Sequence, residues 1–124
     1  MYIEFNPNPY GLLANDCVVR AISFVTGYSW IKTYIELAIQ GMMLGDMPSS
    51  NNTWGVYLSN KGYKKCLSPL EYPECYKVKD FCMDHPKGTY ILATGSHVVA
   101  VKDGDYYDAW DSGNECITYF FRRT

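Results

Sequence analysis

One thiol, one imidazole and one carboxylate lie in this sequence where local structure could bring them to a common point. Cys17 opens an apolar segment typical of a helix, and His97 opens a strand whose hairpin partner carries Asp108. A thiol at a helix N-terminus is favoured as the thiolate by the positive end of the helix dipole. A histidine and a carboxylate on neighbouring strands can supply a base and the group that orients it. The three residues predict nucleophilic catalysis by a cysteine.

The register of the hairpin decides which carboxylate meets the imidazole. The Asp-Gly pair at 103–104 strongly favours a two-residue turn. With that turn, His97 and Asp108 share a face as diagonal neighbours, about 7–8 Å apart between backbones. Asp111 faces the other side in this register. We therefore expect Asp108, and not Asp111, to orient the imidazole.

Helical patterns fill the first half of the chain and strand patterns the second. A lead-in over the first fifteen residues is predicted to be extended and to lie on the fold. The first expected helix begins at a cap on Asn15 or Asp16 and ends at Gly27. The second runs from a cap on Ser29 to Gly41, with its apolar residues at helical spacing: Ile31, Tyr34, Ile35 and Ala38. After a loop over 42–52, the third covers about Thr53 to Asn60. The expected strands are Tyr63–Leu67, Thr89–Ala93, Val98–Lys102, Asp105–Trp110 and Cys116–Phe121, with one or two helical turns at Val78–Met83. This order predicts an α+β fold in which N-terminal helices pack on a C-terminal antiparallel β-sheet.

Length and composition limit the class of protein. The 124 residues, 48% of them hydrophobic, predict a single domain over 1–124 with a packed core. A net charge of -2 gives no general attraction to nucleic acid. No signal peptide is visible and no segment approaches the roughly 20 apolar residues of a membrane span, so we expect no membrane partner. Five irregularly spaced cysteines without a CxxC favour a reduced, cytoplasmic protein with free thiols.

Three short segments resemble papain-like cysteine peptidases. The stretch N15-D-C-V-V-R-A-I-S is similar to the start of their nucleophile helix, and H97-V-V-A-V resembles their histidine strand. D108-A-W-D resembles the papain Asn-Ser-Trp-Gly element, with an acid in place of the Asn as in bacteriocin-leader peptidases. The resemblance follows the whole chain in order and is tight only at these segments, most of all to small phage-encoded papain-like proteins. It implies a minimal papain-like domain with a catalytic triad of Cys17, His97 and Asp108, located in the host cytoplasm where a phage encodes it.

The chain departs from that family at the oxyanion donor. Relatives place a Gln six residues before the nucleophile, and here that position is Gly11. A side-chain amide is still needed beside the Cys17 backbone N–H to stabilise the developing negative charge. Asn15 is the predicted donor, with Asn6 or Asn8 as alternatives if the lead-in folds over the start of the helix.

Two tryptophans and one Cys–His pair are further candidates for substrate and metal binding. Trp54 and Trp110 are candidates for walls of a substrate groove. Alternatively, Trp54 packs in the core, and Trp110 covers His97 as a lid. Cys82 and His85 have the spacing of half a zinc site, but no second tight pair completes it. We therefore expect no metal and no cofactor.

These observations leave three functions open. The first is a thiol hydrolase, a peptidase or an amidase or isopeptidase, that acts on a peptide or protein through an acyl-enzyme. The second is a non-catalytic, phage-derived protein of the same fold that binds and modulates a host protein. The third transfers the acyl group to an amine instead of water.

Overall fold

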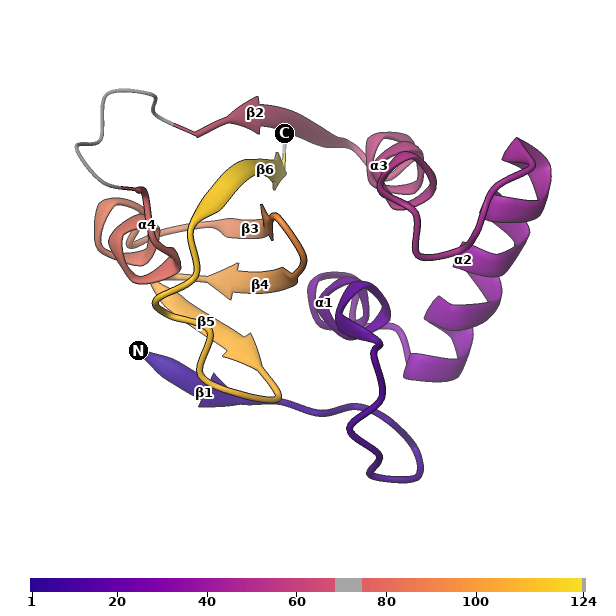
Figure 1. Cartoon of the computed structure of the whole chain (residues 1–124), viewed down its shortest axis with the longest axis horizontal. Coiled ribbons are helices and arrows are strands. Elements are labelled where there is room, and N and C mark those ends of the chain that lie inside the picture. Colours follow the sequence, from indigo (N-terminus) through magenta and orange to yellow (C-terminus); the bar gives the residue numbers. More distant parts are fainter. Residues whose placement is uncertain (69–74, 124) are drawn as a thin grey trace.

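The structure, a computed structural model, describes residues 1–68 and 75–123 of the chain. Within these residues, helices come mostly before strands, and the helices lie around one twisted sheet (Figure 1). The helices are α1 (Cys17–Thr26), α2 (Trp30–Leu44), α3 (Asn51–Asn60) and α4 (Val78–Asp84). The strands are β1 (Tyr2–Glu4), β2 (Tyr63–Leu67), β3 (Thr89–Thr94), β4 (Val98–Lys102), β5 (Asp105–Asp108) and β6 (Ile117–Arg123). The predicted α+β class is confirmed.

The sheet is mixed, which corrects the expected antiparallel arrangement. Its strand order is β1-β5-β4-β3-β6-β2, and β1 runs parallel to β5 while the other neighbours are antiparallel. The lead-in was predicted to be extended and to lie on the fold, and its Tyr2–Glu4 segment pairs with β5 and covers the edge that β5 would otherwise leave open. The last strand, β6, does not continue the meander from β5 but returns to pair with β3 and β2.

The β4–β5 hairpin has the predicted turn and register. Lys102 pairs with Asp105 across the turn, and Ala100 pairs with Tyr107. Asp103 and Gly104 both have positive φ, at 52° and 82°, as a type I′ turn requires. The Asp-Gly signal therefore fixed this hairpin correctly.

Helices cover both faces of the sheet, so the central strands are buried on both sides (Figure 1). Val98 and Ala100 pack in a cluster with α1 and α3, whereas Val99 and Val101 pack in a second cluster with α4. This double burial explains why β4 is an unbroken apolar run instead of an alternating one.

Helix α2 is longer than predicted and exposes the positions expected to be buried. It continues past Gly41 to Leu44 and is capped by Gly45, whose φ is 71°. Gly41 is required within the helix for close packing, because an added Cβ there would lie 2.7 Å from the Asp46 carbonyl oxygen. Ile31 and Ile35 are 51% and 52% exposed. Because α2 lies on α1 and α3 rather than on the sheet, a narrower face suffices, formed by Thr33, Leu37 and Gly41 (Figure 1).

Two cysteines correct the expectation that all thiols are free. Cys75 and Cys116 form a disulfide across a sequence separation of 41 residues. Cys17, Cys66 and Cys82 are free thiols. Among the described residues, no helix has the length and apolar character needed to cross a membrane.

Candidate active site

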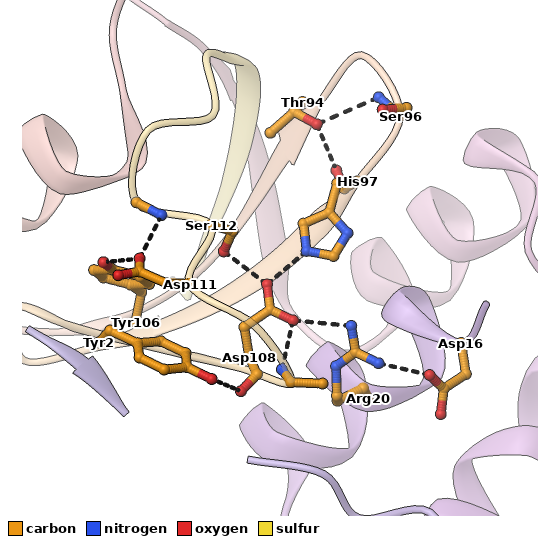
Figure 2. A network of polar contacts seen from close by, with 12 residues as sticks. Tyr2, Asp16, Arg20, Thr94, Ser96, His97, Tyr106, Asp108, Asp111 and Ser112 are labelled. Atoms are coloured by element: carbon orange, nitrogen blue, oxygen red, sulfur yellow. Dashed lines mark hydrogen bonds and ion pairs between the residues drawn. The ribbon is translucent and has the colours of Figure 1, made fainter. Parts of the chain in front are cut away.

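The fold brings the three predicted residues together from three elements. Cys17 is the first residue of α1, His97 directly precedes β4 and Asp108 ends β5. His97 Nε2 lies 2.5 Å from Asp108 Oδ2 (Figure 2). Nδ1 is then the ring nitrogen that remains for the Cys17 thiol, whose pKa is governed by this imidazole. The packing of α1 against β4 closes the separation of 80 residues between Cys17 and His97, and the β4–β5 hairpin closes that of 11 residues between His97 and Asp108.

Both His97 and Asp108 lie beyond the paired part of the β4–β5 ladder, which ends at Ala100 and Tyr107. A turn in which the Thr94 N–H donates to the His97 carbonyl oxygen at 2.8 Å holds the histidine backbone. Side chains outside the ladder are not bound by its strict alternation. This is why the two residues can meet each other and also reach α1.

The thiol and imidazole shift each other toward the charged forms. Burial alone would raise the pKa of Cys17, but the hydrogen bonding and charge of His97 more than offset it, so the pKa lies below that of an ordinary thiol. Burial likewise opposes the charged form of His97, yet Asp108 and Cys17 raise the pKa of the imidazole to about 9. Each group therefore favours the charged form of the other, an imidazolium beside a thiolate.

The Asp108 carboxylate is fully buried and accepts hydrogen bonds from four donors. Oδ2 accepts from His97 and from the Ser112 hydroxyl at 2.7 Å, and Oδ1 accepts from Arg20 at 2.9 Å and from the Ala109 N–H at 2.7 Å (Figure 2). Burial would raise the pKa of this carboxyl, but its partners, His97 first, hold it below the usual range. Asp108 is thus a fixed anion that orients the ring.

Arg20 is a site residue that the sequence interpretation missed. Its guanidinium is buried and bridges two carboxylates, Asp16 Oδ1 at 2.6 Å and Asp108 Oδ1 at 2.9 Å (Figure 2). It stands one helical turn after Cys17, so it ties the thiol-bearing helix to the orienting acid. The signal was present: a charged side chain in an otherwise apolar, buried helix requires a buried counter-charge. Ser112 was also missed, and nothing in its local sequence distinguishes it.

Asp16 is the N-cap residue of α1, one of the two predicted positions, but its side chain makes no capping hydrogen bond. Oδ1 is held by Arg20, and Oδ2 accepts from Trp30 Nε1 at 2.8 Å. The negative charge next to Cys17 is therefore compensated by a buried cation. The same contacts anchor the start of α2 to the start of α1.

Two clefts meet at the thiol. The first encloses about 200 Å³ and the second about 210 Å³, and both are lined by Asn15, Cys17 and His97. The first continues past Ser49, at the approach to α3, and along the β3–β4 turn. The second continues past Leu13 to Trp110. A chain-like molecule could lie across the sulfur with one arm in each cleft.

Asn15, the predicted oxyanion donor, is exposed next to Cys17 in the chain and lines both clefts. The side chains of the two alternatives, Asn6 and Asn8, make hydrogen bonds within the lead-in. Asn6 Nδ2 donates to the Leu12 carbonyl oxygen at 3.2 Å, and Asn8 Oδ1 accepts from the Tyr10 N–H at 2.9 Å.

The two tryptophans have different positions. Trp54 is fully buried in the core, where its indole N–H donates to Asn51 Oδ1 at 3.0 Å, so its assignment to the groove was wrong. Trp110 is 46% exposed, and its ring centroid lies 4.6 Å from that of His97. Cys82 is buried while His85 stacks on Phe81, and the described residues contain no cluster of three or more metal-binding side chains.

Comparison of the chain with models of protein families, with curated proteins and with solved structures gave no match.

Proposed function

We propose that this chain is a papain-like thiol hydrolase, a peptidase or an amidase or isopeptidase, in which Cys17, His97 and Asp108 act as a triad. The observation that carries the proposal is the Asp108–His97 contact at 2.5 Å beside a thiol whose pKa is lowered by that imidazole. A fixed acid, a charged imidazole and a thiolate are the parts that covalent amide cleavage by cysteine requires.

The chemistry is acyl transfer. The Cys17 thiolate attacks the substrate carbonyl carbon and forms an S–C bond, and the C–N bond breaks as His97 gives its Nδ1 proton to the leaving amine. Water then attacks the thioester, returns a proton to His97 and releases the acid together with the thiolate. The Cys17 backbone N–H, which as the first in α1 has no intrahelical acceptor, and the Asn15 amide are the donors proposed for the oxyanion. An amine in place of water would give acyl transfer by the same steps.

A non-catalytic role in binding a host protein is the second candidate. The observation in its favour is the exposed apolar side of α2, where Ile31, Ile35 and Ile39 are each about half exposed. Exposed apolar patches of this kind often mark interaction sites.

The proposed cytoplasmic location has the Cys75–Cys116 disulfide against it, because disulfides persist mainly in oxidising compartments.

The deciding experiment is to incubate the protein with a mixed peptide library and to identify new termini by mass spectrometry. The proposal expects products from the wild type that are absent with Cys17→Ala and His97→Ala. A Cys66→Ser variant, which removes a free thiol outside the site, is the matched control and should leave the products unchanged. No products from any variant, with Cys17 no more reactive toward alkylation than Cys66, would support the binding role instead.

A further inference from the structure

We propose that the cleft between Leu13 and Trp110 receives an apolar side chain of a peptide substrate adjacent to the bond that is cleaved, an inference that rests on the proposed hydrolase function. The cleft contains Cys17 and His97, so a group bound there lies next to the reacting sulfur. At about 210 Å³ it is smaller than the roughly 300–1,000 Å³ of sites that enclose a whole small ligand. Its size suits one side chain of a longer molecule.

The two large side chains exposed at this cleft are apolar. Leu13 is 79% exposed and Trp110 is 46% exposed, and the small side chains of Ala14 and Ala109 also line the cleft. Large apolar side chains left in water at the mouth of a reactive site are stabilised when a ligand covers them, at about 25 cal/mol per Å² removed from water.

The charged groups in the cleft are already neutralised by one another. Asp16 and Arg20 line it, but the 2.6 Å ion pair between them is buried, and Arg20 also binds Asp108. Asp16 has its second oxygen occupied by Trp30. A charged substrate group would have to displace these contacts to find a partner, whereas an apolar group would not. The electrostatics of the cleft therefore select an apolar occupant.

The loop that presents Leu13 is held in place before any ligand binds. Gly11, with φ of 66°, turns the chain while its N–H donates to the Asn8 carbonyl oxygen at 3.0 Å. The Asn6 side chain bonds the Leu12 carbonyl oxygen, directly before Leu13. A wall fixed in advance loses little conformational entropy on binding.

The opposite cleft differs in character, which gives the groove a direction. Asn15, Cys17 and His97 line both clefts. The rest of this lining combines hydroxyl and amide side chains with smaller apolar ones: Ser49, Asn51, Thr94 and Ser96 with Val18, Ala93 and Val98. The contrast predicts a substrate with an apolar residue on one side of the scissile bond and a polar or small residue on the other.

The test compares two reagents at the same thiol. In each, the Cys17 thiolate displaces iodide, so that an S–C bond forms as the C–I bond breaks. One reagent is iodoacetamide and the other is N-benzyl-iodoacetamide, whose ring can enter the cleft. Rates at Cys17 are measured by peptide mass spectrometry, with the rates at Cys66 as the internal reference for intrinsic reagent reactivity.

We expect the benzyl reagent to be faster than iodoacetamide at Cys17 by about tenfold after this correction, and Leu13→Asn to reduce that ratio to about one to threefold. Leu12→Asn is the matched control, because Leu12 is also exposed but does not line the cleft. It should retain the ratio. A ratio near one in the wild type, or equal losses in the two variants, would overturn the inference.

The ratio is independent of how reactive Cys17 is, because both reagents report on one thiol. A slow reaction with iodoacetamide would count against the proposed hydrolase function, whereas a fast reaction with no preference for the benzyl group would count only against the apolar cleft. The two failures are therefore distinguishable.

Discussion

At the scale of single residues, the coupled titration of Cys17 and His97 predicts two different pH profiles. The pKa of the thiol is lowered and that of the imidazole is raised to about 9, so the ion pair exists between these two values. Alkylation needs only the thiolate and should rise through the lowered Cys17 pKa and stay high. Peptide hydrolysis also needs the His97 proton for the leaving amine, so it should fall again as pH rises through about 9.

Removal of the imidazole should raise the pKa of the thiol. In His97→Gln the burial of Cys17 remains while the favourable cation is lost, so alkylation at pH 7 should slow by at least about tenfold. The measurement is the rate of Cys17 labelling against pH, with Cys66 in the same protein as control. An unchanged profile would show that the imidazole does not stabilise the thiolate.

The orienting acid is tested by a pair of carboxylates three residues apart. Asp108→Asn removes the anion that holds His97, and we expect the Cys17 alkylation profile to move to higher pH. Asp111→Asn should leave that profile unchanged, because Asp111 accepts from the Tyr106 hydroxyl and the Gly113 N–H instead. The reverse result would assign the orienting role to Asp111.

Parts of the triad were predictable because they are local. The helix start at Cys17 and the Asp-Gly turn each depend on a few neighbouring residues and were predicted correctly. His97 and Asp108, however, meet beyond the paired β4–β5 ladder, where its register does not decide which side chains come together. The bridge through Arg20 was missed because it joins residues 88 apart in the chain, which no local pattern specifies.

At the scale of elements, Arg20 joins α1 to the end of β5. Arg20→Met would leave two buried carboxylates, Asp16 and Asp108, without their cation, and loss of one member of a buried pair typically costs about 3–5 kcal/mol. We expect a fall of this size in the free energy of unfolding, measured by urea denaturation. Arg20→Lys keeps the charge but cannot bridge both acids, so it should cost less. Equal stability of Arg20→Met and the wild type would contradict the bridge.

Helix α2 tests the distinction between an apolar pattern and a buried face. Leu37→Ala should cost about 2–5 kcal/mol because Leu37 is fully buried. Ile35→Gln should change the free energy of unfolding by no more than about 0.5 kcal/mol, since this side chain is half exposed. Thermal or urea denaturation of both variants provides the comparison. A large loss in Ile35→Gln would mean that another surface covers this face in solution.

Elements were predictable where propensity and packing agree. The Ser29 cap and the Asp-Gly turn were found correctly because each depends on local hydrogen bonding or φ. The buried face of α2 was not predicted correctly. Ile31 and Ile35 follow helical spacing, but the buried side of the helix is formed by Thr33 and Leu37. Likewise, Tyr2 and Ile3 favour a strand, but a segment of 3 residues is too short to predict one, and β1 forms because β5 offers it an open edge.

At the scale of the whole molecule, the Cys75–Cys116 disulfide closes the segment that carries α4, β3, β4 and β5, and with them His97 and Asp108. In the chain-entropy account, a cross-link over 41 residues stabilises mainly by restricting the unfolded chain, by about 2–4 kcal/mol. A double variant, Cys75→Ser with Cys116→Ser, should lose this amount in urea denaturation, while Cys66→Ser should lose little. Because typical domains have about 5–15 kcal/mol of stability, the double variant should still fold. Its Cys17 alkylation rate in native buffer should match the wild type, since the hydrogen bonds that hold His97 and Asp108 involve neither cysteine. A loss of thiol reactivity without a loss of stability would show that the disulfide instead sets the positions of His97 and Asp108 in the folded state.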